Sequence, residues 1–304
     1  MSSSTDPRHR LTAADFDPEV LKLFDLYVHG LIDRRGFLDR AARHAALAGT
    51  TAVGLLAALS PDFAHAQQVR PDDARLQTAW ANFASPQGNG TVRAYTVRPA
   101  AARGPLPAVL VVHENRGLNP HIEDVARRLA LEGYLAIAPD ALHTLGGYPG
   151  DEDKARAAFG TLDLKKTAED FVAAAQWALT APGSNGRLGA VGFCYGGGIV
   201  NLVATRVPEL RAGAPYYGLG APAADVPRIR AELQIVYAEN DERINAGWPA
   251  YQAALQAAGT RHEAQVYPGT QHGFHNDTTP RYDATQAPIA WGRTLALFRR
   301  TLQG

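Results

Sequence analysis

Residues 191–198 read Val-Gly-Phe-Cys-Tyr-Gly-Gly-Gly, and this stretch decides the fold. A β-like run, residues 187–191, leads into it, and a helix-like run follows it. Its core has the form Gly-x-Cys-x-Gly, which is the nucleophile-elbow pattern with cysteine in place of serine. An elbow is a sharp strand-to-helix turn, and it needs Gly192 and Gly196 because neighbouring Cβ atoms would not fit. The pattern therefore predicts that Cys194 is raised above the edge of a sheet.

Cys194 is also the only cysteine of the chain. It has no partner for an internal disulfide, which favours a reactive thiol. The alternative is a small buried residue at a strand end, a common role for cysteine. The flanking glycines and the strand–turn–helix context favour the nucleophile.

The charge balance excludes some classes of partner. Lys and Arg together number 30, as do Asp and Glu, so the formal net charge is zero. This gives no general electrostatic reason to bind nucleic acid or an anionic membrane. The 304 residues are 46% hydrophobic, and 29 glycines with 20 prolines fit a loop-rich α/β protein.

Strand-like and helix-like runs alternate along the chain. Residues 108–113 form a continuous apolar run, which is typical of a central parallel strand buried on both faces. The predicted strands are 91–97, 108–113, 134–140, 187–193, 210–217, 233–237 and 262–267, and the predicted helices are 119–131, 162–179, 246–258 and 287–302. Residues 69–83 are expected to be irregular, with short helical content at most. This order predicts an α/β fold, with a mostly parallel central sheet and helices on both faces.

Residues 1–66 have the order of elements of a bacterial export signal. Arg34 and Arg35 begin a twin-arginine motif, and a mildly apolar run, 45–59, follows them. That run is about 15 residues long, short of the roughly 20 that span a bilayer. Ala-His-Ala at 64–66 fits a signal-peptidase site.

We therefore predict cleavage after Ala66 and an α/β-hydrolase domain at 67–304. The domain would be exported folded by the twin-arginine machinery, would work in the periplasm and would keep no stable membrane anchor. Residues 16–32 look like an amphipathic helix ahead of the arginines. A chance arginine pair in an ordinary helix is the alternative interpretation.

A thiol nucleophile needs a base, and the base needs an orienting acid. In an elbow enzyme the chain order is nucleophile, acid, base. Asp241 follows the predicted strand 233–237, and His272 follows the last predicted strand, so both are expected at the carboxyl edge of the sheet. Glu239 is a weaker candidate for the acid, and His275 for the base.

The segment after the apolar strand reads His-Glu-Asn-Arg-Gly, at 113–117. Glu114 at the end of a buried strand is costly without a partner, and its position predicts that it lies close to the elbow. The backbone N–H groups of Asn115 and Tyr195 are the expected oxyanion donors.

These motifs together resemble the dienelactone hydrolase family. The resemblance runs from about residue 91 to residue 303, nearly all of the predicted mature domain. It implies an α/β-hydrolase fold and a triad of Cys194, Asp241 and His272. It also implies that Glu114 interacts with the resting thiol until substrate displaces it and a thiolate forms. Thiolate fraction controls cysteine nucleophilicity, so the implied role is chemically sound.

In the founding enzymes of that family, arginines hold the substrate carboxylate. No arginine follows His272 directly, and the segment 141–150 contains none. Arg116 and Arg281 are the nearest in sequence.

The sequence therefore predicts a hydrolase that acts on a small-molecule ester, thioester or lactone through an acyl-enzyme. No cofactor is expected, and no metal, because His272 and His275 lack a cysteine or carboxylate cluster arranged for ligation. A cysteine peptidase or amidase on the same scaffold is the first alternative. A non-catalytic binding protein is the second alternative. A site that no longer catalyses a reaction should have lost one of the three triad residues, and all three are present here.

Overall fold

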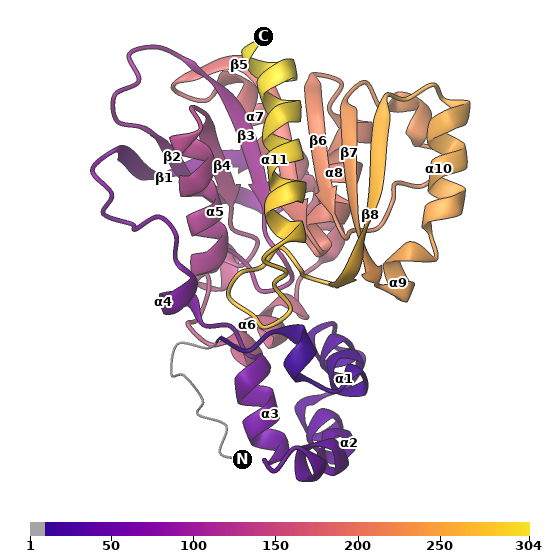
Figure 1. Cartoon of the computed structure of the whole chain (residues 1–304). Coiled ribbons are helices and arrows are strands. Elements are labelled where there is room, and N and C mark those ends of the chain that lie inside the picture. The colour runs from indigo at the N-terminus through magenta and orange to yellow at the C-terminus, as the bar shows by residue number, and fades with distance from the viewer. Residues whose placement is uncertain (1–9) are drawn as a thin grey trace.

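An eight-stranded sheet forms the centre of the molecule (Figure 1). The structure is a computed structural model and describes residues 10–304. The strand order is β1-β2-β4-β3-β5-β6-β7-β8. The pairs β1–β2 and β2–β4 are antiparallel, and all other pairs are parallel. The strands are β1 (Leu76–Ser85), β2 (Gly90–Pro99), β3 (Leu106–Val112), β4 (Leu135–Pro139), β5 (Ser184–Phe193), β6 (Leu210–Tyr216), β7 (Glu232–Asn240) and β8 (His262–Gln271).

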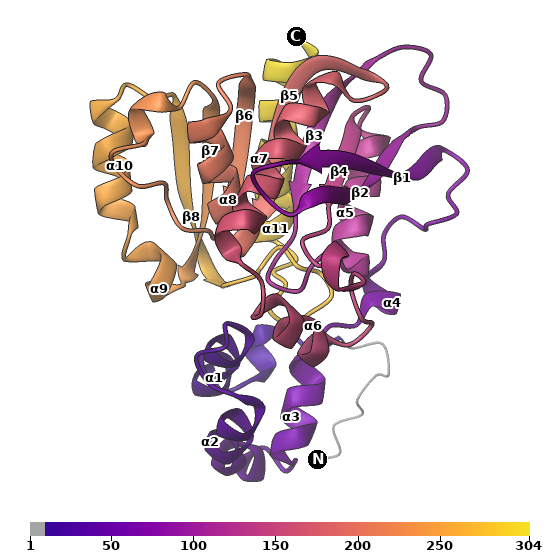
Figure 2. The same ribbon diagram turned by 180° about the vertical axis from the view of Figure 1, so that it is seen from behind.

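Helices cover both faces of this sheet, as predicted. Helices α5 and α11 lie on the face seen in Figure 1, and α7 and α8 lie on the face seen in Figure 2. The helices are α1 (Pro18–Val28), α2 (Arg34–Leu47), α3 (Ala52–Leu59), α4 (Phe63–Ala66), α5 (Pro120–Leu131), α6 (Glu152–Phe159), α7 (Leu164–Thr180), α8 (Tyr195–Arg206), α9 (Glu242–Asn245), α10 (Trp248–Ala257) and α11 (Gln286–Phe298).

Strand β3 shows why a continuous apolar run predicts a central strand. Alternate side chains of a strand point to opposite faces. Leu110 and Val112 therefore join the core under α7 and α8, whereas Val109 and Val111 join the core under α5 and α11. All four side chains are fully buried, so neither face of β3 can be polar.

The expectation for residues 69–83 was wrong, because β1 occupies Leu76–Ser85. This edge strand pairs only with β2, and most of its side chains are exposed. Leu76, Phe83 and Ser85 are its only buried residues. It therefore lacks the alternation by which a half-buried strand is recognised.

The nucleophile elbow forms at the junction of β5 and α8. Cys194 has φ 55° and ψ −114°, a conformation that L-residues adopt at a cost. A Cβ at Gly192 would lie 2.2 Å from the carbonyl oxygen of Gly196, and a Cβ at Gly196 would lie 2.3 Å from that of Val112. The two glycines are therefore required by close backbone approach, as predicted.

Residues 10–66 fold into helices below the carboxyl ends of the strands (Figures 1 and 2). Helices α1, α2 and α3 share a hydrophobic core of their own, in which Phe37 and Leu59 are fully buried. We call residues 10–66 the N-terminal unit. No single helix of the described chain is long and apolar enough to cross a membrane, but the bent pair Arg34–Leu47 and Ala52–Ala66, at 99°, passes that test of length and composition together.

Candidate active site

Asp241 and His272 meet at the carboxyl edge of the sheet. Asp241 follows β7 and caps α9, and His272 follows β8. The Nδ1 atom of His272 lies 2.5 Å from Oδ2 of Asp241, and both side chains are buried. Nδ1 therefore donates to the carboxylate, which leaves the Nε2 lone pair free. Nε2 is buried without a hydrogen-bond partner among the described residues and lies within 4.8 Å of the Cys194 sulfur.

The sulfur of Cys194 lies among positive charges. Burial acts to raise the pKa of this thiol, but His272 and His29 outweigh burial and lower the pKa to about 6. Burial disfavours charge on His272 as well, yet the Cys194 thiolate and Asp241 raise the pKa of His272 to about 10. Between these two values the site holds a thiolate and an imidazolium, which is the reactive form of a cysteine–histidine pair.

We expect the alkylation rate of Cys194 to reflect this ion pair. Only the thiolate reacts, so the rate with iodoacetamide should stay near its maximum down to about pH 7 and fall by half near pH 6. The alkylation rate of an unperturbed thiol would fall to half its maximum at about pH 8.5. Because Cys194 is the only cysteine, the rate needs no correction for other thiols. A midpoint at the ordinary thiol value would contradict the ion pair.

Glu114 and Cys194 line one cavity, but no hydrogen bond joins the Glu114 carboxylate to the sulfur. Its Oε2 accepts from Nδ2 of Asn276 at 3.0 Å, while both Glu114 and Cys194 line the cavity. Asn115 also lines the cavity. Tyr195 is the first residue of α8, so its N–H is one of the helix donors with no intrahelical acceptor. The fold therefore brings Glu114, Asn115 and Tyr195 close to Cys194.

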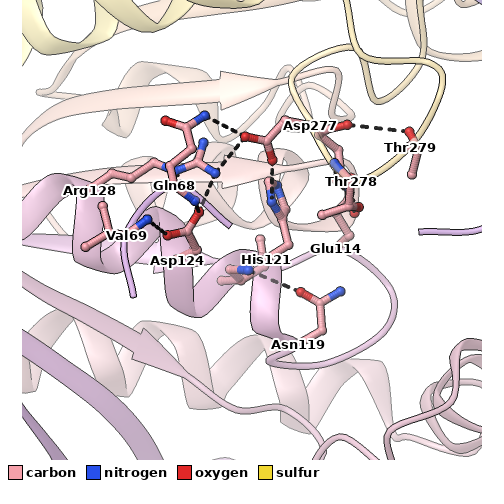
Figure 3. Close-up of polar contacts among 12 residues, drawn as sticks. Gln68, Val69, Glu114, Asn119, His121, Asp124, Arg128, Asp277, Thr278 and Thr279 are labelled. Carbon is pink, nitrogen blue, oxygen red and sulfur yellow. Dashed lines mark hydrogen bonds and ion pairs between the residues drawn. The ribbon is translucent and has the colours of Figure 1, made fainter. Parts of the chain in front are cut away.

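A buried polar network fixes the loop that carries Asn276 (Figure 3). The carboxylate of Asp277 accepts from Gln68 at 2.6 Å and from Arg128 at 2.7 Å, and it lies 3.2 Å from Nδ1 of His121. Burial acts to raise the pKa of Asp277, but His121 and Arg128 hold it well below its usual range. The loop after β8 is thus tied to α5 by charge-assisted bonds.

The weaker candidates for acid and base lie elsewhere. Glu239 is exposed, and its Oε2 accepts from the backbone of Gly269 at 2.8 Å. The His275 ring stacks on Phe193 with centroids 4.9 Å apart, and burial lowers its pKa to about 3. Neither residue lines a cavity with Cys194.

Two residues that the sequence analysis did not single out contact the catalytic groups. Nε2 of His29, which directly follows α1, lies 3.4 Å from the Cys194 sulfur. Tyr217 follows β6 with φ 35° and is fully buried, and its ring centroid lies 5.0 Å from that of His272. A non-glycine residue with positive φ is uncommon, and here it sits beside the site. No local pattern marks either residue.

The N-terminal unit forms one wall of the site. The carbonyl oxygen of Val28, at the end of α1, accepts from Nδ2 of Asn115 at 2.8 Å and from Arg116 at 3.2 Å. Tyr27 binds Asp153 through its hydroxyl, and its carbonyl accepts from Arg156 at 2.7 Å. These contacts join the end of α1 to the loop after β3 and to α6.

Two cavities meet at the sulfur. One has a volume of about 340 Å³ and is mainly polar; its walls include Arg34 and Tyr27 of the N-terminal unit and Glu114, Arg116 and Arg281 of the hydrolase domain. The other has a volume of about 390 Å³ and is mainly apolar. Its apolar wall is formed by Ile199, Leu202, Leu219, Ala221, Pro222 and Ile244.

One group of side chains could hold a metal ion. Ligand atoms of His29, Cys194 and His272 lie within 4.8 Å of one another. However, Arg243 donates to Nε2 of His29 at 2.9 Å, so a cation would meet a guanidinium there. The expectation that no metal or cofactor is needed stays a prediction.

Comparison with known proteins agrees with this geometry. The model of the dienelactone hydrolase family matches residues 92–302, which is more than half of the chain. This chain belongs to the dienelactone hydrolase family. The family assignment and the eight-stranded fold confirm the α/β-hydrolase prediction and identify the chain as a hydrolase. A second family model, described as YqhI-like, matches residues 8–45 of the N-terminal unit.

Curated relatives include other dienelactone hydrolase-like proteins. A "Putative carboxymethylenebutenolidase" of Escherichia coli K12 is 36% identical over 246 residues, which are 76% of this chain and 89% of that protein. YghX, a "Putative hydrolase fragment" of the same organism, is 54% identical over 106 residues, 35% of this chain and 91% of the fragment. Among solved structures, a "Putative Dienelactone Hydrolase" of Klebsiella pneumoniae is 30% identical, with a TM-score of 0.64, and the match covers 74% of this chain and 99% of that one.

Proposed function

We propose that this hydrolase cleaves an ester, thioester or lactone with Cys194 as nucleophile, His272 as base and Asp241 as the orienting acid. The observation that carries the proposal is the 2.5 Å bond between His272 and Asp241, which leaves Nε2 of His272 free beside the sulfur of a strained elbow.

In the proposed acylation step, the thiolate attacks the carbonyl carbon and forms a C–S bond. The carbonyl oxygen becomes an oxyanion, for which the backbone N–H groups of Asn115 and Tyr195 are the proposed donors. The tetrahedral intermediate collapses, the bond to the leaving oxygen breaks, and the His272 imidazolium gives that oxygen a proton. Glu114, held by Asn276, lies at the polar cavity, where it is proposed to take part in thiol activation.

Deacylation reverses these roles. His272 takes a proton from water, the resulting hydroxide attacks the thioester, and the sulfur leaves as a thiolate. The proton on His272 then restores the resting ion pair. Every proton stays within substrate, water and imidazole, so this sequence requires no further reactant.

The polar cavity favours a substrate that carries a carboxylate. Arg281 is almost fully buried, and its Nε and Nη1 atoms have no hydrogen-bond partner among the described residues. Its nearest carboxylate contact is Asp25 at 3.8 Å. Arg116 is also buried, but its Nη1 already donates to Val28 and Asn115 and its Nε lies 3.4 Å from Glu152, so Arg281 is the guanidinium with free donors. Buried guanidinium donors without partners are ready to bind a planar anion. The apolar cavity on the other side of the sulfur would take a hydrocarbon group.

We expect Arg281→Gln to weaken binding of a carboxylate-bearing ester selectively. Loss of a charge-assisted contact costs about 1.5–3 kcal/mol, so KM should rise roughly 10- to 100-fold for that ester. KM for a neutral ester with the same leaving group should change little. Steady-state kinetics on the two esters tests this, and an equal effect on both would remove Arg281 from substrate binding.

A substrate panel tests the proposed function. Full-length protein is assayed on activated esters, thioesters, enol lactones including a dienelactone, and matched amides and peptides. Hydrolysis of esters and lactones far above amides supports the proposal. Preference for amides would favour the cysteine peptidase or amidase. Tight binding of a panel compound without turnover would favour the binding protein.

We propose separately that the twin-arginine motif directs export to the periplasm and that the chain is cleaved after Ala66. The proposal rests on the order of motif, apolar run and Ala-His-Ala site. Both arginines are exposed in the folded chain, where Arg34 pairs with Asp153 at 2.8 Å and Arg35 lies 3.8 Å from Asp39. Cell fractionation and the N-terminal sequence of the protein test it, and a cytoplasmic protein with an intact N-terminus would contradict it.

A further inference from the structure

A histidine from outside the hydrolase domain reaches the nucleophile. His29 follows α1 directly, and its Nε2 atom lies 3.4 Å from the Cys194 sulfur. Its ring meets His272 edge to face, with centroids 4.6 Å apart. The sulfur thus has two imidazoles beside it, and one of them is supplied by the N-terminal unit.

The orientation of His29 repeats that of His272. Nδ1 of His29 lies 2.8 Å from the carbonyl oxygen of Asp25 and 3.2 Å from its Oδ1. Nδ1 therefore carries the hydrogen, and the Nε2 lone pair faces the sulfur. Nη2 of Arg243 lies 2.9 Å from the same Nε2 atom and donates to its lone pair while His29 is neutral, which brings a positive charge close to the sulfur. The backbone carbonyl of Asp25 orients the imidazole of His29, and its carboxylate lies nearby, whereas the imidazole of His272 is oriented by the carboxylate of Asp241.

The N-terminal unit is held in place by fixed contacts at the two residues that precede His29. Val28, the preceding residue, is bound by Asn115 and Arg116, both directly after β3. Tyr27 is bound by Asp153 and Arg156 of α6. The two preceding residues are anchored to the hydrolase domain and the ring is oriented by Asp25, so the side chain of His29 has a defined position.

We propose that His29 is a second catalytic imidazole that holds the Cys194 sulfur in its reactive form beside His272, and that the N-terminal unit is therefore a working part of the enzyme. The inference rests on the proposed role of Cys194 as nucleophile, and it is the alternative to cleavage after Ala66, which would remove His29 from the enzyme. It names a catalytic group on a part of the chain that the dienelactone hydrolase match, residues 92–302, does not include.

The proposed step is a proton transfer within the site. The S–H bond of Cys194 breaks, its electron pair stays on sulfur, and the proton goes to Nε2 of His272, which has no other hydrogen-bond partner among the described residues. In acylation His272 passes a proton to the leaving oxygen, while the charge around His29 continues to stabilise the sulfur as a thiolate. The charged or titratable groups that face His29 are Asp25 on its own helix, Arg243 on α9, Cys194 and His272. Positive charge beside a thiol lowers its pKa.

The test uses the full chain and His29→Gln, which removes the imidazole and keeps a polar side chain. The pH profile of iodoacetamide alkylation should shift upward, with the rate at pH 6 falling about fivefold for a one-unit rise in thiol pKa from about 6. The kcat for a neutral ester at pH 6 should fall by a similar factor, with little change in KM. His44→Gln is the matched control, because His44 lies on α2 of the same unit, pairs with Asp17 and lines neither cavity at the sulfur.

A second variant covers the case in which His29→Gln loosens the fold. Asp25→Asn keeps the imidazole and its bond to the residue 25 carbonyl but removes the carboxylate charge that favours a cationic His29, so it should shift the alkylation profile in the same direction by a smaller amount. An alkylation profile identical to wild type in both variants would overturn the proposal. Faster turnover in His29→Gln would also overturn the proposal, because His29 would then block access of the substrate to the Cys194 sulfur.

The outcome for Cys194→Ala separates this inference from the proposed function. If Cys194→Ala retains turnover, the proposed nucleophile is wrong. If it is inactive and His29→Gln behaves as wild type, only the inference about His29 fails. Active protein that begins at Gln67 and keeps the wild-type alkylation profile would contradict the inference as well, because cleavage after Ala66 removes His29.

Discussion

Cys194→Ala is expected to abolish hydrolysis. The elbow presents this one side chain to both cavities, and no other thiol exists in the chain to replace it. Loss of the covalent route should lower kcat by about 10⁴-fold or more, leaving the residual rate that binding and the oxyanion donors supply. The measurement is kcat on an activated ester.

Cys194→Ser provides the matched comparison. It keeps the size and the position of the nucleophile but replaces a thiol of low pKa with a hydroxyl that is hardly ionised. It should be strongly impaired, with any remaining activity rising steeply with pH. Wild-type turnover in Cys194→Ala would show that the chemistry does not pass through the sulfur.

Asp241→Asn is expected to have the second largest effect. The carboxylate accepts from Nδ1 of His272 and so keeps the Nε2 lone pair toward the sulfur. An asparagine amide that donates to Nδ1 would place the hydrogen on Nε2, and His272 could then accept no proton. The lost charge would also destabilise the imidazolium. We expect kcat to fall by about 10²–10⁴-fold.

The matched control for this change is Glu239→Gln. Glu239 lies at the end of the same strand and is exposed, and its carboxylate binds the backbone of Gly269 instead of His272. Its activity should stay near wild type. An equal loss in both variants would point to a structural effect on the loop after β7, and the acid would then have to be reassigned.

The parts of the site that the sequence predicts are those built from local patterns. Gly192 and Gly196 mark the elbow because their hydrogen atoms face backbone carbonyls. Asp241 and His272 could be found because each directly follows a strand whose carboxyl end reaches the same sheet edge. Strand β3 could be found because burial on both faces requires an uninterrupted apolar run.

The remaining parts depend on long-range contacts that no window of sequence contains. His29 lies 165 positions before Cys194, and only the docking of the N-terminal unit brings them together. Arg281 is returned to the cavity by the loop after β8, which the Asp277 network holds in place. Strand β1 was missed because its side chains are mostly exposed, so its sequence shows no alternation of apolar and polar residues.

Residues 34–66 show how one pattern can fit two structures. Arginines followed by an apolar run predict an export signal, yet the same residues form α2, α3 and α4. Phe37 and Ala41 point into the core of the N-terminal unit, at the spacing of one helix face. Export and cleavage stay a proposal, and the N-terminal sequence of the active protein decides whether His29 remains with the enzyme.

Capture of the acyl-enzyme decides whether Cys194 is the nucleophile. Full-length protein is mixed with an activated ester, quenched in acid during the first turnovers, and measured by intact and peptide mass spectrometry. We predict one acyl group on the peptide that contains Cys194, which disappears when the substrate is exhausted and never forms in Cys194→Ala. Continued turnover with no acyl group on Cys194, or an acyl group on another residue that is kinetically competent, would contradict the account.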